Sequence, residues 1–308
     1  MTKVLISDRT HPVLEERLRK AGFVVSVEPD HDYVSLIQAA QGCDALVVRS
    51  KVIIDRAFID AVPSLLCIGR VGAGMETIDV DYAEQRGIRC LNSPEGNRDA
   101  VGEHTVGLLL ALLNNIARAD AEVRRGLWHR EENRGYELGN LTVGIIGMGN
   151  MGRSFAKRLS GFGCRIIYYD INPNLPELPE TPERVSLETL QAEADIVSFH
   201  VPLTPETHHY LDAAFINAMA KPFFLLNTSR GAVVDTEALA AGLANGKVRG
   251  AGLDVLENEN MQSDSLSTLN SQLLTQNVVF TPHVAGWTVE SKYKLAAVLA
   301  DKIIDALR

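Results

Sequence analysis

The stretch TVGIIGMGNMGRSFAKRL, residues 142–159, decides the fold of this chain. It begins as an apolar strand and ends as an amphipathic helix, and Gly147, Gly149 and Gly152 between them fit the pattern G-x-G-x-x-G. In such a motif the first glycine permits a tight turn, the second lets the backbone approach a pyrophosphate, and the third lets the helix pack closely on the strand. The pattern alone is weak, but its position between a strand and a helix gives it weight.

The helical end of this motif adds a second argument. Free N–H groups and the positive end of the helix dipole attract phosphates at a helix N-terminus, and here Asn150 and Met151 occupy that position. A plain glycine-rich turn is the alternative interpretation. The strand–turn–helix context favours a dinucleotide site.

Asp170 indicates which dinucleotide binds. It follows a predicted strand at residues 165–169 and lies 18 residues after Gly152. That spacing is close to the ~20 residues at which an acidic side chain binds the ribose hydroxyls. A carboxylate repels a 2′-phosphate, and residues 171–173 supply no arginine. We therefore expect NAD rather than NADP, with Asp170 as the cap of a turn as the alternative.

Outward from the motif, short apolar runs alternate with helical segments through most of the chain. One series covers residues 1–95, and a second begins at residue 141. Apolar runs of this kind, separated by helices, predict parallel sheets covered on both faces. A single long helix is expected over residues 99–125, a polar loop over 126–140, and a last helix over 289–307. The expected fold class is α/β, with two doubly wound units whose ligand lies at the carboxyl ends of the strands.

The amino-acid composition limits the classes of protein to which this chain can belong. The 308 residues are 46% hydrophobic and 22% charged, with a net charge of −9, which predicts a globular protein and argues against nucleic acid as a partner. The longest strongly apolar run, residues 106–113, is far shorter than the ~20 residues that span a bilayer. Residues 1–8 are typical of a strand and not of a signal peptide. Four scattered cysteines without a C-x-x-C pair favour reduced thiols in the cytoplasm and no metal site.

Three charged residues in the second half follow predicted strands. Arg230 can hold a carboxylate in a planar fork, His283 can exchange a proton near neutral pH, and Glu259 can orient a histidine and raise its pKa. Residues at the carboxyl ends of parallel strands share one edge of the sheet. Spacing alone leaves two interpretations open, a catalytic set and ordinary surface charges.

At this point the sequence resembles the D-isomer-specific 2-hydroxyacid dehydrogenases over about residues 3–305. Seven ordered segments carry the resemblance: VGAGMETIDV (71–80), NSPEGNRDAVGEHTVG (92–107), VGIIGMGNMG (143–152), HVPLTPETHH (200–209), NTSRGAVVDTEAL (227–239), GAGLDV (250–255) and TPHVAGWT (281–288). The resemblance implies a flavodoxin-like substrate domain of residues 1–95 plus 286–308 and an NAD-binding Rossmann domain of residues 96–285. It also implies a homodimer and no membrane partner.

The resemblance assigns roles by motif. Arg230 would bind the substrate carboxylate and carbonyl, His283 would act as acid and base, and Glu259 would be its carboxylate partner, with Glu257 as the open alternative. Asp254 would bind the nicotinamide carboxamide. The other positions line the cofactor or hold the substrate carboxylate through backbone amides: His200, Pro202 and Thr228 for the cofactor, and Gly72, Ala73 and Gly74 for the substrate.

Within the family the chain looks most like phosphoglycerate dehydrogenases, enzymes of serine biosynthesis, in a short form without a regulatory domain. The residues that match substrate contacts there are Arg49, Ser50, Lys51 and Arg130, the last reaching the site from a partner subunit. Their alternative is solvated surface charge. The substrate is then a small anionic acid, 3-phosphoglycerate first and hydroxypyruvate or glyoxylate second. An NAD-sensing binding protein is the alternative outside enzymes.

Two further features of the sequence are expected to have no special role in the chemistry. The family's Asp-Asn after the substrate loop is Glu76-Thr77 here, which leaves the general chemistry alone. His208 and His209 resemble a metal-binding pair, but adjacent side chains need not converge and no carboxylate spacing supports a site. A loop is the favoured interpretation of this segment.

Overall fold

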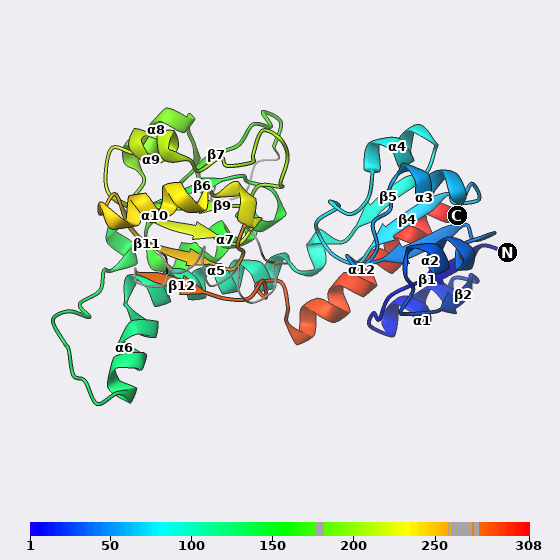
Figure 1. Ribbon diagram of the computed structural model, residues 1–308, viewed down its shortest axis with the longest axis horizontal. Helices are drawn as coiled ribbons and strands as arrows, with labels where there is room; N and C mark the ends of the chain where they lie inside the picture. Colours follow the sequence, from blue (N-terminus) through cyan, green and yellow to red (C-terminus); the bar gives the residue numbers. More distant parts are fainter. Residues whose placement is uncertain (176–181, 258, 260–272, 274–276) are drawn as a thin grey trace. The chain divides into compact units, whose positions relative to one another are not determined.

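The computed structural model describes residues 1–175, 182–257, 259, 273 and 277–308. It forms two compact units (Figure 1), one made of Met1–Arg98 with Trp287–Arg308 and the other of Asp99–Gly286. The polar segment that the sequence left without a pattern, residues 258–276, lies outside the described residues except for Glu259 and Leu273.

The first unit is built on five parallel strands in the order β2-β1-β3-β4-β5. The strands are β1 (Lys3–Ile6), β2 (Val24–Val27), β3 (Ala45–Val48), β4 (Cys67–Arg70) and β5 (Arg89–Asn92). The helices are α1 (Val13–Lys20), α2 (Tyr33–Ala39), α3 (Arg56–Ala61), α4 (Val80–Gln85) and α12 (Val289–Leu307), with a 3₁₀ turn η1 (Pro94–Gly96).

Alternating side chains in β1 explain how helices cover both faces of this sheet. Val4 and Ile6 belong to one buried cluster with residues of α1 and α12, whereas Leu5 belongs to the opposite cluster with Phe58 of α3. Successive side chains of a strand point to opposite faces. The C-terminal helix α12, whose Thr288 cap accepts a hydrogen bond from the Ser291 N–H, thus completes a core that begins at the N-terminus.

The second unit holds seven parallel strands in the order β12-β11-β10-β9-β6-β7-β8. The strands are β6 (Thr142–Ile146), β7 (Arg165–Tyr169), β8 (Glu183–Arg184), β9 (Ile196–Phe199), β10 (Phe223–Asn227), β11 (Val248–Leu253) and β12 (Val278–Phe280). The helices are α5 (Arg98–Leu113), α6 (Ile116–Arg124), α7 (Asn150–Leu159), α8 (Leu187–Glu193), α9 (Ala213–Ala218) and α10 (Thr236–Ala244), with 3₁₀ turns η2 (Leu138–Asn140), η3 (Ser160–Phe162) and η4 (Gly231–Val233).

The two strand orders confirm the predicted fold class. The first sheet has the flavodoxin-like order, and the second has the Rossmann order with one further strand. In the second sheet the order in which strands are added reverses at β6, which has β7 on one side and β9 on the other. Ligands of such sheets bind at this switch point, beyond the carboxyl ends of the strands. The glycine-rich turn after β6 lies there.

The single helix predicted over residues 99–125 is wrong. Two helices replace it, α5 and α6, which meet at a bend of 60°. Asn115 between them has a left-handed φ of 52°, a conformation that asparagine tolerates better than most residues, and two consecutive asparagines are poor helix formers. The bend separates a buried helix from an exposed one, because α5 contributes eight buried residues and α6 none within the described chain.

Among the described residues, no single helix has both the length and the apolar composition to cross a membrane. Only α5 and α6 counted together across their bend meet that test.

Candidate active site

The turn between β6 and α7 is tight at two glycines and open at the third. Gly147 has a φ of 91°, and a Cβ there would lie 2.6 Å from the carbonyl oxygen of His200. A Cβ on Gly152 would lie 2.1 Å from the carbonyl oxygen of Gly147. A Cβ on Gly149 would meet nothing within 4 Å. The turn therefore leaves open space over its middle glycine, which is the shape that an approaching pyrophosphate needs.

Asp170 lies against this turn. Its Oδ2 accepts a hydrogen bond from the Met148 N–H at 2.6 Å, and its Oδ1 accepts one from the Asn172 N–H at 2.8 Å. The carboxylate therefore caps a local turn, which was the alternative interpretation of Asp170, and it also borders the glycine motif. Arg184 of β8, which the sequence did not single out, donates to the carbonyl oxygens of Asp170, Asn172 and Pro173. Its guanidinium is thus engaged with backbone carbonyls.

His200 follows β9 on the other side of the turn. Its Nε2 lies 2.9 Å from Ser198 Oγ, and its Nδ1 is buried with no hydrogen-bond partner in the described part of the chain. Burial lowers the pKa of His200 to about 3, so the ring is neutral. A buried polar atom without a partner is costly, and a polar group of a bound cofactor would satisfy it.

The other two residues expected to line the cofactor follow β9 and β10. Thr228 is 9% exposed, and its Oγ1 lies 3.1 Å from Thr105 Oγ1 of α5. The carbonyl oxygen of Pro202 accepts a hydrogen bond from Thr207 Oγ1 at 2.6 Å and so closes a short turn. Both residues lie at the carboxyl edge of the sheet, as the glycine motif does.

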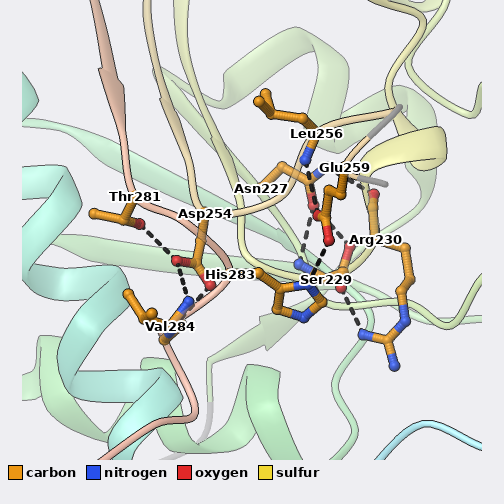
Figure 2. A network of polar contacts seen from close by, with 10 residues as sticks. Asn227, Ser229, Arg230, Asp254, Leu256, Glu259, Thr281, His283 and Val284 are labelled. Carbon is orange, nitrogen blue, oxygen red and sulfur yellow. Dashed lines mark hydrogen bonds and ion pairs between the residues drawn. The ribbon is translucent and has the colours of Figure 1, made fainter. Parts of the chain in front are cut away.

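His283 and Glu259 form a hydrogen-bonded pair at the same edge (Figure 2). His283 Nδ1 lies 2.7 Å from Glu259 Oε2. The hydrogen bond that His283 makes to the Glu259 carboxylate raises the pKa of His283, against burial and the nearby charge of Arg230, which lower it. Burial is the largest influence on Glu259 and raises its pKa, but the hydrogen bond and charge of His283, the Leu256 N–H and the charge of Arg230 together hold this pKa below its ordinary value. The pair therefore favours a protonated ring beside an ionised carboxylate.

Glu257, the open alternative, does not contact His283. Its Oε1 lies 2.5 Å from His209 Nε2, and its Oε2 accepts hydrogen bonds from Thr236 Oγ1 at 2.7 Å and from the Thr236 N–H at 3.3 Å. The segment after β11 thus sends two glutamates to two different histidines.

Asp254 fixes the turn that carries His283. This carboxylate is 1% exposed, and it accepts hydrogen bonds from Thr281 Oγ1 at 2.6 Å and from the N–H groups of Val284 and Ala285 at 2.9 Å each. His283 has a left-handed φ of 53°, and its N–H donates to the Asp254 carbonyl oxygen at 2.7 Å. The structure therefore gives Asp254 a role that the sequence did not suggest, since its carboxylate holds the backbone on which the ring sits.

His104 of α5 adds a side-chain contact to this turn. Its Nε2 lies 2.9 Å from Thr281 Oγ1 and 3.5 Å from Asp254 Oδ1. Sequence analysis did not identify His104 as a site residue, because nothing local shows that the middle of α5 meets the strand end after β12.

Arg230 projects from a turn that Asn227 organises. Asn227 is fully buried, its Oδ1 accepts hydrogen bonds from the Ser229 N–H and Oγ, and its Nδ2 donates to the Arg230 carbonyl oxygen at 2.9 Å. The next residue, Gly231, touches the glutamate segment so closely that a Cβ would lie 1.9 Å from the Leu256 carbonyl oxygen. The turn of Arg230 and the segment of Glu259 are thus packed backbone to backbone.

The residues expected to hold the substrate carboxylate lie in the first unit. Gly72 has a φ of 153°, its N–H donates to Ser93 Oγ at 3.2 Å, and Asn92 Nδ2 donates to the Ala73 carbonyl oxygen at 2.7 Å. A Cβ on Gly72 would collide with the guanidinium of Arg70. Arg70 is a cation beside this loop that the sequence analysis did not identify. Gly74, the third residue of the loop, is half-buried.

Two of the basic residues expected to bind a substrate phosphate, Arg49 and Lys51, belong to the first unit, and their neighbours differ. The Arg49 guanidinium lies 5.0 Å from the ring centre of Trp287, while Lys51 Nζ lies 3.5 Å from Asp30 Oδ1. Asp30 also pairs with Arg9 at 3.2 Å, and Ser50 is exposed. Lys51 is thus partly neutralised, and Arg49 stacks on an aromatic ring.

Arg130 belongs to the second unit and is exposed on the loop after α6.

Comparisons with known proteins identify a matching family and similar individual proteins. The family model for the D-isomer specific 2-hydroxyacid dehydrogenase, NAD binding domain, matches residues 106–285. A hydroxypyruvate reductase of Thermotoga maritima is 40% identical over 264 residues, covering 86% of this chain and 85% of that protein. A D-3-phosphoglycerate dehydrogenase of Methanocaldococcus jannaschii is 36% identical over 312 residues, but this chain spans only 58% of its length.

A solved structure shows the same likeness. The D-lactate dehydrogenase of Aquifex aeolicus, in complex with NAD and lactic acid, superposes with a TM-score of 0.82 at 28% identity, covering 97% of this chain and 94% of that one.

Proposed function

Since the chain belongs to the D-isomer-specific 2-hydroxyacid dehydrogenases, we propose that it moves a hydride between NAD and C2 of a small anionic 2-hydroxy or 2-keto acid. The family is one of NAD-dependent enzymes, and NAD is the cofactor. The observation that carries the proposal is the 2.7 Å hydrogen bond between His283 and Glu259, at the sheet edge that Arg230 also occupies.

His283 moves the proton in this scheme. Because Nδ1 bonds Glu259, Nε2 is the ring nitrogen that serves the substrate. In reduction, protonated His283 donates from Nε2 to the carbonyl oxygen, and the ion pair with Glu259 keeps that proton available. In oxidation, the neutral ring accepts the hydroxyl proton. When bound, NADH would supply the hydride in the first direction and NAD⁺ would accept it in the second.

The remaining site residues bind and orient. Arg230 holds the substrate carboxylate through its planar fork. The loop of residues 72–74 is proposed to add backbone N–H groups, apart from that of Gly72, which donates to Ser93 Oγ. The glycine motif with Asn150 and Met151 takes the pyrophosphate, and Asp170 takes the ribose hydroxyls. Asp254 contacts the nicotinamide carboxamide, while His200, Pro202 and Thr228 line the cofactor.

We propose 3-phosphoglycerate and its keto form, 3-phosphohydroxypyruvate, as the substrate pair, which places the chain in serine biosynthesis. The support is Arg49, a cation whose guanidinium can still bind phosphate while it stacks on Trp287, with Arg130 contributed by a partner subunit. A second candidate is reduction of hydroxypyruvate or glyoxylate. It is favoured by the contact between Lys51 and Asp30, which weakens the cationic pocket.

A substrate panel separates the two. NADH oxidation is measured with 3-phosphohydroxypyruvate, hydroxypyruvate, glyoxylate and pyruvate, using the wild type and Arg49→Glu. A kcat/KM at least about tenfold higher for the phosphorylated acid, a difference of ~1.4 kcal/mol, together with a KM that rises for that acid alone in the variant, supports the phosphate pocket. Equal effects of the variant on all four acids discard the pocket and keep the redox chemistry. No turnover of any acid contradicts the proposed function.

We further propose a homodimer in the cytoplasm. In Figure 1 α6 extends away from the sheet of its unit, and the large apolar side chains on it and on the loop after it are exposed, namely Ile116, Val123, Leu127 and Trp128. Such a patch marks a protein interface. All four cysteines are free thiols, as a reducing compartment requires. Sedimentation of the wild type and of Trp128→Glu tests the dimer, which the variant should weaken.

A further inference from the structure

A second cluster of histidine and glutamate lies apart from the His283–Glu259 pair. His208 and His209 follow β9, and their rings stack with centroids 4.1 Å apart and an interplanar angle of 27°. Glu257, from the segment after β11, lies beside them. One ligand atom from each of the three residues falls within 4.8 Å of the other two. From spacing alone we expected a plain loop here, without convergence of the two rings and a carboxylate.

The backbone explains why two adjacent side chains converge. His209 has a left-handed φ of 52°, so the chain turns sharply between the two rings. The His208 N–H donates to the Thr204 carbonyl oxygen at 2.9 Å, and the His209 N–H donates to the Ala232 carbonyl oxygen at 2.8 Å. A left-handed residue that is not glycine costs about 1–2 kcal/mol. These bonds hold the conformation against that cost.

Each of the three side chains is available in a different way. The ring of His208 is exposed and makes no hydrogen bond to any other described residue. His209 Nε2 lies within hydrogen-bond distance of Glu257 Oε1, at 2.5 Å. Glu257 Oε2 is held by Thr236 Oγ1 and N–H, which leaves Oε1 aimed at the histidines. This is the arrangement of a metal-binding carboxylate oriented by outer hydrogen bonds.

We propose that His208, His209 and Glu257 bind a divalent zinc-like ion. Two imidazole nitrogens and one carboxylate oxygen suit Zn²⁺ and its transition-metal neighbours, whereas Mg²⁺ and Ca²⁺ prefer oxygen ligands throughout. The ion replaces the proton between His209 and Glu257 and leaves the Thr236 contacts intact. Bonds of about 2.0–2.2 Å to each ligand require only that this pair open slightly and that the exposed His208 ring swing toward it. A water or a small anion takes the fourth position.

The proposed ion would join three segments of the second unit. These are the turn after β9, the start of α10 through Thr236, and the segment after β11, which carries Glu259 two residues later. Binding therefore stabilises the fold around this junction. The site is separate from the hydride chemistry, and its test does not depend on any substrate.

The test is calorimetric titration of the full, tag-free chain with Zn²⁺ after dialysis against a chelator. We expect one ion per chain and a raised melting temperature in its presence. His208→Ala, which removes an exposed ring without breaking a hydrogen bond, should weaken binding at least about tenfold, as should Glu257→Gln, which keeps an acceptor for Thr236. His129→Ala is the matched control, an exposed histidine outside the cluster, and should bind as the wild type does. Co²⁺ in place of Zn²⁺ should show the visible absorption of a four-coordinate site.

Three results would contradict the proposed zinc site. If His208→Ala and Glu257→Gln bind Zn²⁺ as tightly as the wild type, the site does not exist. If His283→Ala removes binding while His208→Ala does not, the ion occupies the proposed active site instead. Mg²⁺ binding as tight as Zn²⁺ binding would also overturn the assignment, because imidazole ligands would then not be selecting the ion.

Discussion

The glutamates of two His–Glu pairs come from the same segment of this protein, but the surroundings of the two pairs differ. His283 with Glu259 and His209 with Glu257 both place a left-handed histidine against a glutamate that follows β11, at 2.7 Å and 2.5 Å. In the first pair the histidine side chain is 51% exposed, and in the second 34%. Glu257 is also bound twice by Thr236, whereas Glu259 accepts a further hydrogen bond from the Leu256 N–H. The His283–Glu259 pair is therefore the more accessible one, beside Arg230. The His209–Glu257 pair is the anchored one, because Thr236 holds its glutamate.

The comparison teaches that a hydrogen-bonded histidine and carboxylate do not by themselves make an acid–base catalyst. What distinguishes the surroundings of His283 is the nearby charge of Arg230 and the glycine-rich turn after β6 at the same edge of the sheet. The predictions below test whether the two pairs differ as their surroundings indicate.

Replacement of the accessible histidine should have the largest effect. His283→Ala removes the proton donor, and general acid–base catalysis is worth about 10²–10⁴-fold, so we expect kcat for 2-keto acid reduction to fall by that factor while NADH still binds. Steady-state kinetics and NADH fluorescence measure the two quantities. His11→Ala, a histidine of the first unit, is the control. Near-normal turnover in His283→Ala would remove this residue from the mechanism.

Glu259→Gln should have a smaller effect than loss of the ring. The amide keeps one acceptor oxygen, where the carboxylate offers Oε2 to His283 and Oε1 to the Leu256 N–H, and it loses the charge that holds the proton on the ring. We expect kcat to fall at least about tenfold, or ~1.4 kcal/mol in the barrier, with circular dichroism and melting temperature close to the wild type. A variant as active as the wild type would mean that the carboxylate does not assist the histidine.

Gly231→Ala should disturb the packing that joins Arg230 to the glutamate segment. A Cβ 1.9 Å from the Leu256 carbonyl oxygen forces the backbone to move, and overpacking costs about 1–3 kcal/mol. We expect a lower urea midpoint together with a raised KM. The matched control is Gly107→Ala, since a Cβ on that exposed glycine of α5 meets nothing within 4 Å and alanine favours the helix by about 0.5–1 kcal/mol. Equal behaviour of the two variants would contradict the close packing.

Thr236→Val should have the smallest effect and act on the anchored pair alone. The change removes the hydroxyl that donates to Glu257 Oε2 at 2.7 Å, which leaves the N–H contact at 3.3 Å. A hydrogen bond of this kind contributes about 1 kcal/mol. We expect the free energy of unfolding, measured in urea, to fall by this amount. A change in stability below the error of the method would show that Glu257 is not held by Thr236.

The parts of the molecule that the sequence predicts are those that depend on neighbouring residues. The glycine turn, Asp170 after the next strand, and the alternating strands and helices are all local signals, and the fold class follows from them. The break between α5 and α6 was missed because an apolar pattern continues across Asn114 and Asn115.

The choice between Glu257 and Glu259 could not be made from the sequence. The two residues are separated by one position, and their partners, His209, Thr236 and His283, come from three distant segments. Only the positions of those segments in the folded sheet decide which glutamate meets which histidine. The stacking of His208 on His209 depends likewise on a left-handed residue that no local pattern signals.

The most direct test of the central claim is the pH dependence of kcat/KM for NADH-dependent reduction in the wild type and in Glu259→Gln. Reduction needs protonated His283, so activity should fall as pH rises through the pKa of this ring, which Glu259 raises above the ordinary value of 6.5. Without the carboxylate charge that pKa falls, and the alkaline limb of the variant should move to lower pH. Identical limbs in the two proteins would contradict the role of the His283–Glu259 pair as the proton donor.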